Sequence, residues 1–110
     1  MVSEVTIAKA YIQKSQSSAD RGIPFELTFS QFKKLYQAKV CYFTGVRLLP
    51  KERTIDRLDN SKGYTKDNSF ACCLAFNQLK SVVENPNNNL TMNQVSVGFS
   101  RVLEKLNDRP

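Results

Sequence analysis

The residue types best suited to chemistry fall in one short stretch, residues 54–80, with the sequence TIDRLDNSKGYTKDNSFACCLAFNQLK. It contains an acid, Asp56, on a segment that reads as a strand, and an amide, Asn77, on a later segment with helical spacing. A carboxylate and an amide that face each other form an oxygen-rich corner that suits a hard cation such as Mg²⁺. Such an ion polarises a phosphate and stabilises the leaving oxygen during phosphodiester hydrolysis. The stretch therefore predicts a one-ion Mg²⁺ or Mn²⁺ site with Asp56 and Asn77 as ligands.

Both residues also have simpler interpretations. Asp56 could form an ion pair with Arg53, Arg57 or Lys62 on a solvated strand, and surface pairs of this kind are common and contribute little free energy. Asn77 lies on a helix with an otherwise apolar inner face, where an amide without partners costs about 1–3 kcal/mol. A neighbouring loop could supply those partners. The metal site depends on the whole constellation and not on either residue alone.

The composition limits the size of the protein and the kind of partner it has. With 110 residues, 41% of them hydrophobic, the chain is expected to form one domain over residues 1–110. Sixteen Lys and Arg against ten Asp and Glu give a net charge of +6, which favours a polyanion such as DNA. Three cysteines, two of them adjacent, do not suggest a secreted disulfide framework, and no segment resembles a signal peptide or a membrane span. We therefore expect a cytoplasmic protein without a membrane partner.

Helical spacing predicts helices on both sides of this stretch. The first begins near Val5 and ends in the polar run before Gly22. Capping boxes at Thr28-x-x-Gln31 and Thr91-x-x-Gln94 mark the starts of the second helix and of the last one. The inner face of the last helix is expected to consist of Val95, Val97, Phe99, Val102, Leu103 and Leu106. The first and last helices would brace the region between them.

The central region is predicted to be a hairpin followed by a helix. VCYFTGVRLLP, residues 40–50, and RTIDRLD, residues 53–59, have the β-branched and aromatic composition of two paired strands. In the loop that follows, Gly63 is expected to adopt a positive φ and Asn68 to have a structural role. The next helix is expected to begin at a cap on Asp67 or Asn68 and to include the Cys-Cys pair. This order of elements belongs to the α+β class.

The spaced set C-x-x-T-G … D-R-x-D-x-x-x-G-Y-x-x-x-N … C-x-x-x-N-x-x-K resembles the ββα-metal finger of HNH (His-Me finger) nucleases, and most closely the small phage-type HNH proteins. The resemblance covers residues 41–80. It implies that Asp56 and Asn77 are metal ligands, that Asn68 is the structural residue of the loop, and that Lys80 is a basic position one helical turn after Asn77. The implied activity is divalent-metal-dependent hydrolysis of DNA. If a bacteriophage encodes the protein, the expected location is the cytoplasm of the host cell.

The sequence departs from this family at the general base. Arg57 occupies the position of the usual His, and the chain contains no histidine. Arg stays protonated near neutral pH and cannot abstract a proton from water. Its planar guanidinium is instead suited to stabilising the charge on a phosphate in the transition state. Active His-less members of the superfamily have an Asp-Arg pair with a nearby Tyr, so the resemblance assigns catalytic roles to Arg57 and to Tyr64, which would orient a water or a phosphate.

A second departure concerns structural zinc. Many HNH domains bind zinc through two C-x-x-C pairs, and the corresponding pairs here are Cys41 with Thr44 and Cys73 with Phe76. Two thiolates are fewer than the four ligands of a closed tetrahedral site, so no structural zinc is expected. The cysteines are instead expected to be small buried apolar residues.

Basic residues surround the proposed site in the sequence and are expected to contact the DNA backbone: Arg53, Lys62, Lys66 and Lys80. A solvated basic face is the simpler interpretation of this group. Two alternative functions stay open at this point: a catalytically inactive HNH-fold module that binds DNA, and a small viral factor that acts on a host or replication protein. A homodimer would add DNA contacts that a monomer of this size lacks.

Overall fold

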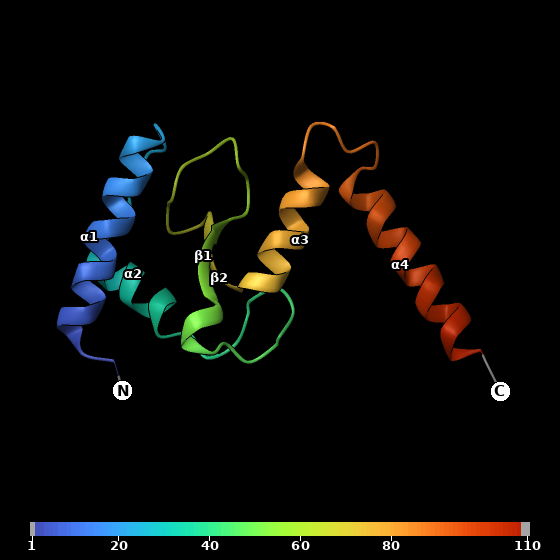
Figure 1. The fold of residues 1–110 in the computed structure, drawn as a ribbon, viewed down its shortest axis with the longest axis horizontal. Helices are drawn as coiled ribbons and strands as arrows, with labels where there is room; N and C mark the ends of the chain where they lie inside the picture. The colour runs from blue at the N-terminus through green and yellow to red at the C-terminus, as the bar shows by residue number, and fades with distance from the viewer. Residues whose placement is uncertain (1, 109–110) are drawn as a thin grey trace. The chain divides into compact units, whose positions relative to one another are not determined.

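The computed structural model describes residues 2–108, which contain four α-helices and one two-stranded antiparallel hairpin. In chain order the elements are α1 (Glu4–Asp20), α2 (Phe29–Tyr36), the short 3₁₀ helix η1 (Pro50–Glu52), β1 (Arg53–Arg57), β2 (Ser69–Cys73), α3 (Leu74–Glu84) and α4 (Met92–Asn107) (Figure 1). The chain divides into two compact units, Met1–Ala75 and Phe76–Pro110. The mixed α+β composition agrees with the predicted class.

A capping box fixes the start of α2. The Thr28 hydroxyl accepts from the Gln31 amide N–H at 3.2 Å, and Gln31 Oε1 accepts from the Thr28 amide N–H at 2.9 Å. These two bonds satisfy backbone donors that have no partner inside the helix, and they confirm the predicted helix start. Upstream, Gly22 follows α1 with a φ of +69°, a conformation that glycine adopts without a steric penalty.

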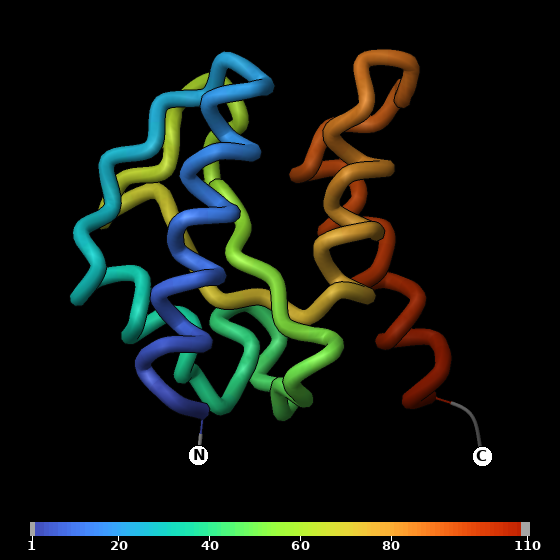
Figure 2. Tube along the Cα trace, turned by 60° about the vertical axis from the view of Figure 1, so that its left-hand side comes forward, coloured from blue at the N-terminus to red at the C-terminus, as the bar shows by residue number. Residues whose placement is uncertain are grey.

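The core of the first unit joins α1, α2 and β1 with the segments between them. Its buried members are Ile7, Leu27, Phe32, Ile55 and Tyr64, each at most 9% exposed. The Tyr11 hydroxyl donates to the Leu27 carbonyl at 2.6 Å, and the Tyr11 ring meets the Phe32 ring edge-on at 5.3 Å. Figure 2 follows the trace of this unit from α1 in blue, through α2 in cyan, to the green and yellow hairpin. The core therefore anchors one face of β1.

The hairpin pairs β1 with β2, and not with residues 40–50 as the sequence suggested. Register places Ile55 opposite Ala71 and Asp56 opposite Phe70. Residues 40–50 instead form turns, with one isolated bridge between Val40 and Arg47. The apolar run SFACC, residues 69–73, is too short for its periodicity to distinguish a strand from a helix. In the structure it forms a strand because its backbone pairs with β1. The prediction was therefore wrong in the strand partner and in the start of the third helix, which begins at Leu74.

The second unit contains α3 from Phe76 onward, a turn, and α4. The Thr91 hydroxyl accepts from the Gln94 amide N–H at 3.1 Å and Gln94 Oε1 accepts from the Thr91 amide N–H at 2.8 Å, which confirms the predicted capping box. The expected inner face of α4 is exposed, with Phe99 at 58% and Leu103 at 59%. None of the helices within residues 2–108 combines the length and the apolar character needed to cross a bilayer.

Candidate functional site

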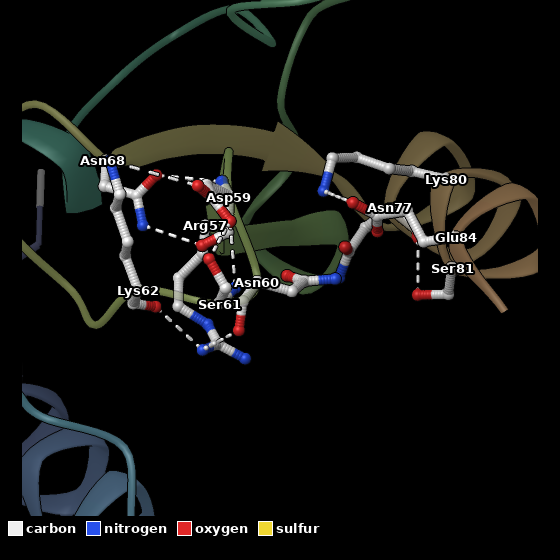
Figure 3. Close-up of polar contacts among 10 residues, drawn as sticks. All are labelled: Arg57, Asp59, Asn60, Ser61, Lys62, Asn68, Asn77, Lys80, Ser81 and Glu84. Atoms are coloured by element: carbon white, nitrogen blue, oxygen red, sulfur yellow. Dashed lines mark hydrogen bonds and ion pairs between the residues drawn. The ribbon is translucent and has the colours of Figure 1, made fainter. Parts of the chain in front are cut away.

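The two expected metal ligands belong to different units of the structure. Asp56 lies in the middle of the hairpin on β1, half-buried, in the first unit. Asn77 lies on α3 in the second unit, where its backbone carbonyl accepts from the Ser81 hydroxyl at 3.0 Å (Figure 3). Across the described residues, no group of three or more Cys, Asp and Glu side chains is gathered to hold an ion.

Asn68 organises the loop between β1 and β2. Its side chain, in a residue only 7% exposed, donates to the Asp59 carbonyl at 3.0 Å, and its Oδ1 accepts from the Asp59 amide N–H at 2.8 Å (Figure 3). The side chain also donates to the Gly63 carbonyl at 2.9 Å. Its own carbonyl accepts from the Leu58 N–H at 3.0 Å. These bonds join the end of the loop, at Asn68, to its start, at Leu58 and Asp59. Asn68 therefore has a loop-bridging role and does not cap α3.

Gly63 is required by a close approach and not by its backbone angle. Its φ is not positive, contrary to the expectation from the sequence. An added Cβ would lie 2.4 Å from the carbonyl oxygen of Pro24 and 2.8 Å from the Pro24 Cβ. Next to this contact, the Tyr64 N–H donates to the Pro24 carbonyl at 2.9 Å and the Glu26 N–H donates to the Tyr64 carbonyl at 2.8 Å. The loop is thus docked against the segment that joins α1 to α2.

Arg57 contacts the same loop. Its Nη1 donates to the carbonyls of Asn60 at 3.0 Å and Lys62 at 2.9 Å (Figure 3), and its guanidinium lies 5.5 Å from the centre of the Tyr64 ring. Successive side chains of a strand point to opposite faces, so Asp56 and Arg57 leave β1 on opposite faces. Arg57 therefore holds the loop in shape, and any role at a phosphate would be added to that one.

Tyr64 is a core residue and only 4% exposed. Two cations lie near its ring, the Lys14 ammonium 4.8 Å and the Arg57 guanidinium 5.5 Å from its centre. Burial raises the pKa of the Tyr64 phenol, but charge and hydrogen bonds from Lys14 and Arg21 outweigh burial and lower that pKa below its ordinary value. The expected role in orienting water at an open site does not fit this burial. The Tyr64 ring instead packs against the Arg57 guanidinium.

Lys62 and Lys66 are the exposed members of the predicted DNA-contacting group. The Lys62 side chain is 72% exposed, with its ammonium 4.0 Å from Asp59 Oδ2, and Lys66 is exposed on the same loop. Surface pairs at this distance contribute little free energy and are weakened further by salt. Both ammonium groups are therefore available to a polyanion.

Lys80 is buried, which corrects its assignment as a surface contact for DNA, and Arg53 is half-buried with its guanidinium held by other parts of the chain. Arg53 Nη2 donates to the Ala38 carbonyl at 3.1 Å, and its guanidinium stacks 5.5 Å from the centre of the Tyr36 ring. Lys80 is 7% exposed, and its ammonium pairs with Glu84 at 2.8 Å (Figure 3). The spacing of Lys80 and Glu84, one turn apart on a helix, was a signal in the sequence that could have revealed this pair.

The three cysteines are buried, as expected, and two of them lie close together. Cys41 Sγ and Cys72 Sγ are 3.9 Å apart, and Cys73 Sγ is 3.9 Å from Thr44 Oγ1. Burial raises the pKa of the Cys41 thiol, but bonds from the Thr44 hydroxyl and from the amides of Cys73, Thr44 and Phe43 outweigh burial and bring the pKa to about 6. Burial and the neighbouring Cys41 raise the pKa of Cys72 to about 12.

The titration of Cys41 predicts a pH-dependent stability. The folded-state pKa of about 6 lies below the ordinary value of 9.0, so the unfolded state binds more protons between these values. The Cys41 contribution is then fully present above the unfolded pKa and is lost as pH falls through about 6. Urea unfolding under reducing conditions should show stability rising over this window, with the rise reduced in Cys41→Ala and in Thr44→Val, which removes the hydroxyl donor. A Cys41→Ala protein with the wild-type pH dependence would contradict this prediction.

Comparison with known proteins identifies one relative and no family. No family model matches the chain, and no solved structure matches it. Over 73 residues, 66% of this chain, it is 29% identical to an uncharacterized protein of Acanthamoeba polyphaga mimivirus. The matched stretch is 14% of that protein, so the chain spans a small part of the length of this relative.

Proposed function

We propose that this chain is a DNA-binding, divalent-metal-dependent endonuclease of the HNH type that hydrolyses phosphodiester bonds. The observation that supports this most strongly is the order of elements around the loop: β1 with Asp56, a loop bridged by Asn68, then β2 continuing directly into α3, which carries Asn77. The same order of strand, loop, strand and helix defines the finger that the sequence resembles. The basic loop residues Lys62 and Lys66 support DNA as the polyanion.

In this proposal Asp56 and Asn77 would hold one Mg²⁺ or Mn²⁺ ion, since carboxylate and amide oxygens are its preferred protein ligands. Bound there, the ion would supply Lewis-acid activation of the phosphate and stabilisation of the leaving oxygen. Arg57 would not serve as a base: its Nη1 keeps the loop carbonyls bound, and it would contribute positive charge from the face of β1 opposite Asp56. Tyr64 would act by holding the guanidinium in place, and Asn68 by fixing the loop.

Two observations favour alternative functions. The commitment of Arg57 to loop carbonyls, in a chain without histidine, favours a catalytically inactive module that binds DNA through Lys62 and Lys66. The exposed apolar side chains of α4, such as Phe99, favour a protein partner, either a second copy in a homodimer or a host or replication protein. Plasmid nicking and plasmid retardation, measured on the same variants, separate these functions.

Asp56→Asn and Asn77→Ala should each reduce metal-dependent nicking of supercoiled plasmid by at least about 100-fold, because each would remove a ligand of the ion. Nicking is measured with Mg²⁺, with Mn²⁺ and with a chelator, and thermal unfolding verifies that each variant is folded. Asp67→Asn is the matched control, since it makes the same charge change as Asp56→Asn at an exposed acid in the loop between β1 and β2.

Wild-type nicking rates in both Asp56→Asn and Asn77→Ala would exclude the proposed metal site. Plasmid that is retarded in a gel but never nicked would favour the inactive binding module, provided that Lys62→Glu combined with Lys66→Glu abolishes the retardation. Absence of both nicking and retardation would favour the protein-interaction function.

A further inference from the structure

A cavity of about 400 Å³ lies within the first unit, between α1, α2 and β1. Small-molecule sites typically have volumes of about 300–1,000 Å³, so this cavity has the size of a ligand site. Arg53, Thr54 and Ile55 line it from β1, and neither Asp56 nor Asn77 is among its lining residues. The cavity is therefore separate from the candidate metal site, and binding of a ligand there does not depend on the proposed nuclease activity.

The charged side chains that line the cavity are cationic. Lys14, whose ammonium also lies 4.8 Å from the centre of the Tyr64 ring, lines it from α1, and Arg53 lines it from the start of β1. None of the residues lining it is an Asp or a Glu. Arg53 is held in position by its bond to the Ala38 carbonyl and by its contact with the Tyr36 ring. Its Nε is buried and finds no hydrogen-bond partner within residues 2–108. A buried donor on a fixed guanidinium, beside a second cation, is an arrangement that suits an anionic acceptor.

The remaining lining residues suit a planar apolar body attached to that anion. The rings of Phe32 and Tyr36, which line one side, are stacked at 5.8 Å with an angle of 28° between their planes. Gln13 and Ser17 on α1 add hydrogen-bonding groups to the lining. Aromatic walls with a few placed polar groups are typical of sites that orient small planar ligands.

We propose that this cavity binds a small organic anion with a planar ring, its phosphate or carboxylate held by Arg53 and Lys14 and its ring packed against Phe32 and Tyr36. A nucleoside monophosphate and an aromatic carboxylate share this chemistry, and the test distinguishes them. The bidentate geometry of a guanidinium makes Arg53 the residue on which affinity depends most.

The test is an NMR titration of the full chain with thymidine monophosphate, with benzoate and with uncharged thymidine. Saturable shifts at the amides of Ala10, Ser17 and Thr54 are expected with at least one of the two anions, and thymidine should bind at least about tenfold more weakly. Arg53→Gln should weaken that binding by at least about tenfold. Lys51→Gln, the same charge change at an exposed residue that does not line the cavity, should leave it unchanged.

A response to one anion alone would support the proposal and identify the head group as phosphate or carboxylate. Because Arg53→Gln also removes contacts to Ala38 and Tyr36, Lys14→Gln serves as a second variant, with thermal unfolding as a check on both. The proposal would be overturned if neither anion gave saturable shifts at these amides. It would also be overturned if folded Lys14→Gln and Arg53→Gln proteins both bound the anions as tightly as the wild type.

Discussion

Gly63→Ala should destabilise the protein by about 3 kcal/mol, since overpacking and a strained hydrogen bond act together there. The added Cβ would lie 2.4 Å from the Pro24 carbonyl oxygen, an atom of the backbone that cannot rotate away. That carbonyl also accepts from the Tyr64 N–H, so relieving the clash would stretch the bond that docks the loop. Urea and thermal unfolding measure the loss.

Gly98→Ala is the matched control for this prediction. Gly98 lies within α4, is exposed, and has nothing within 4 Å of where a Cβ would be. Alanine there should stabilise the protein by about 0.5–1 kcal/mol, because glycine loses more backbone entropy in a helix. The two substitutions should therefore have opposite signs. Equal stability of Gly63→Ala and the wild type would show that the loop is not docked against Pro24.

Asn68→Ala should also cost about 3 kcal/mol, since it leaves several buried backbone groups without partners. The carbonyls of Asp59 and Gly63 would lose their donor and the Asp59 N–H its acceptor, in a part of the loop that water does not reach readily. Asn68→Asp should be at least as harmful, because a carboxylate would place an acceptor against two carbonyl acceptors. Unfolding by urea measures stability, and hydrogen exchange of the Leu58 and Asp59 amides reports on the loop.

Asn88→Ala separates the effect of burial from the effect of losing an asparagine. The Asn88 side chain also donates to two carbonyls, those of Val83 at 2.8 Å and Leu90 at 2.9 Å, but it lies in a half-exposed turn. Water can replace its bonds, so the cost should stay below about 1 kcal/mol. If Asn68→Ala and Asn88→Ala lowered the free energy of unfolding by similar amounts, the hydrogen bonds of Asn68 would contribute no more to stability than those of a half-exposed turn.

The parts of the fold that were predictable from sequence are those decided by neighbouring residues. The capping boxes at Thr28 and Thr91 involve groups three residues apart, so their sequence pattern specifies the geometry. The α+β class followed in the same way from local periodicity. The hairpin could not be predicted in this way, because SFACC fits either a strand or a helix. It becomes a strand only by pairing with β1, which lies on the other side of the intervening loop in the sequence.

The sequence by itself determined the α+β class of the fold and the absence of a histidine base in a basic chain. Only the tertiary structure decided what the side chains of the candidate site do. Arg57 donates to the loop carbonyls, Tyr64 is buried in the core, and Arg53 lines a cavity. The physical reason is that hydrogen bonds, cation–π contacts and close approaches such as Gly63 on Pro24 join residues far apart in the chain. Their partners cannot be read from local spacing, because they exist only once the core has brought the segments together.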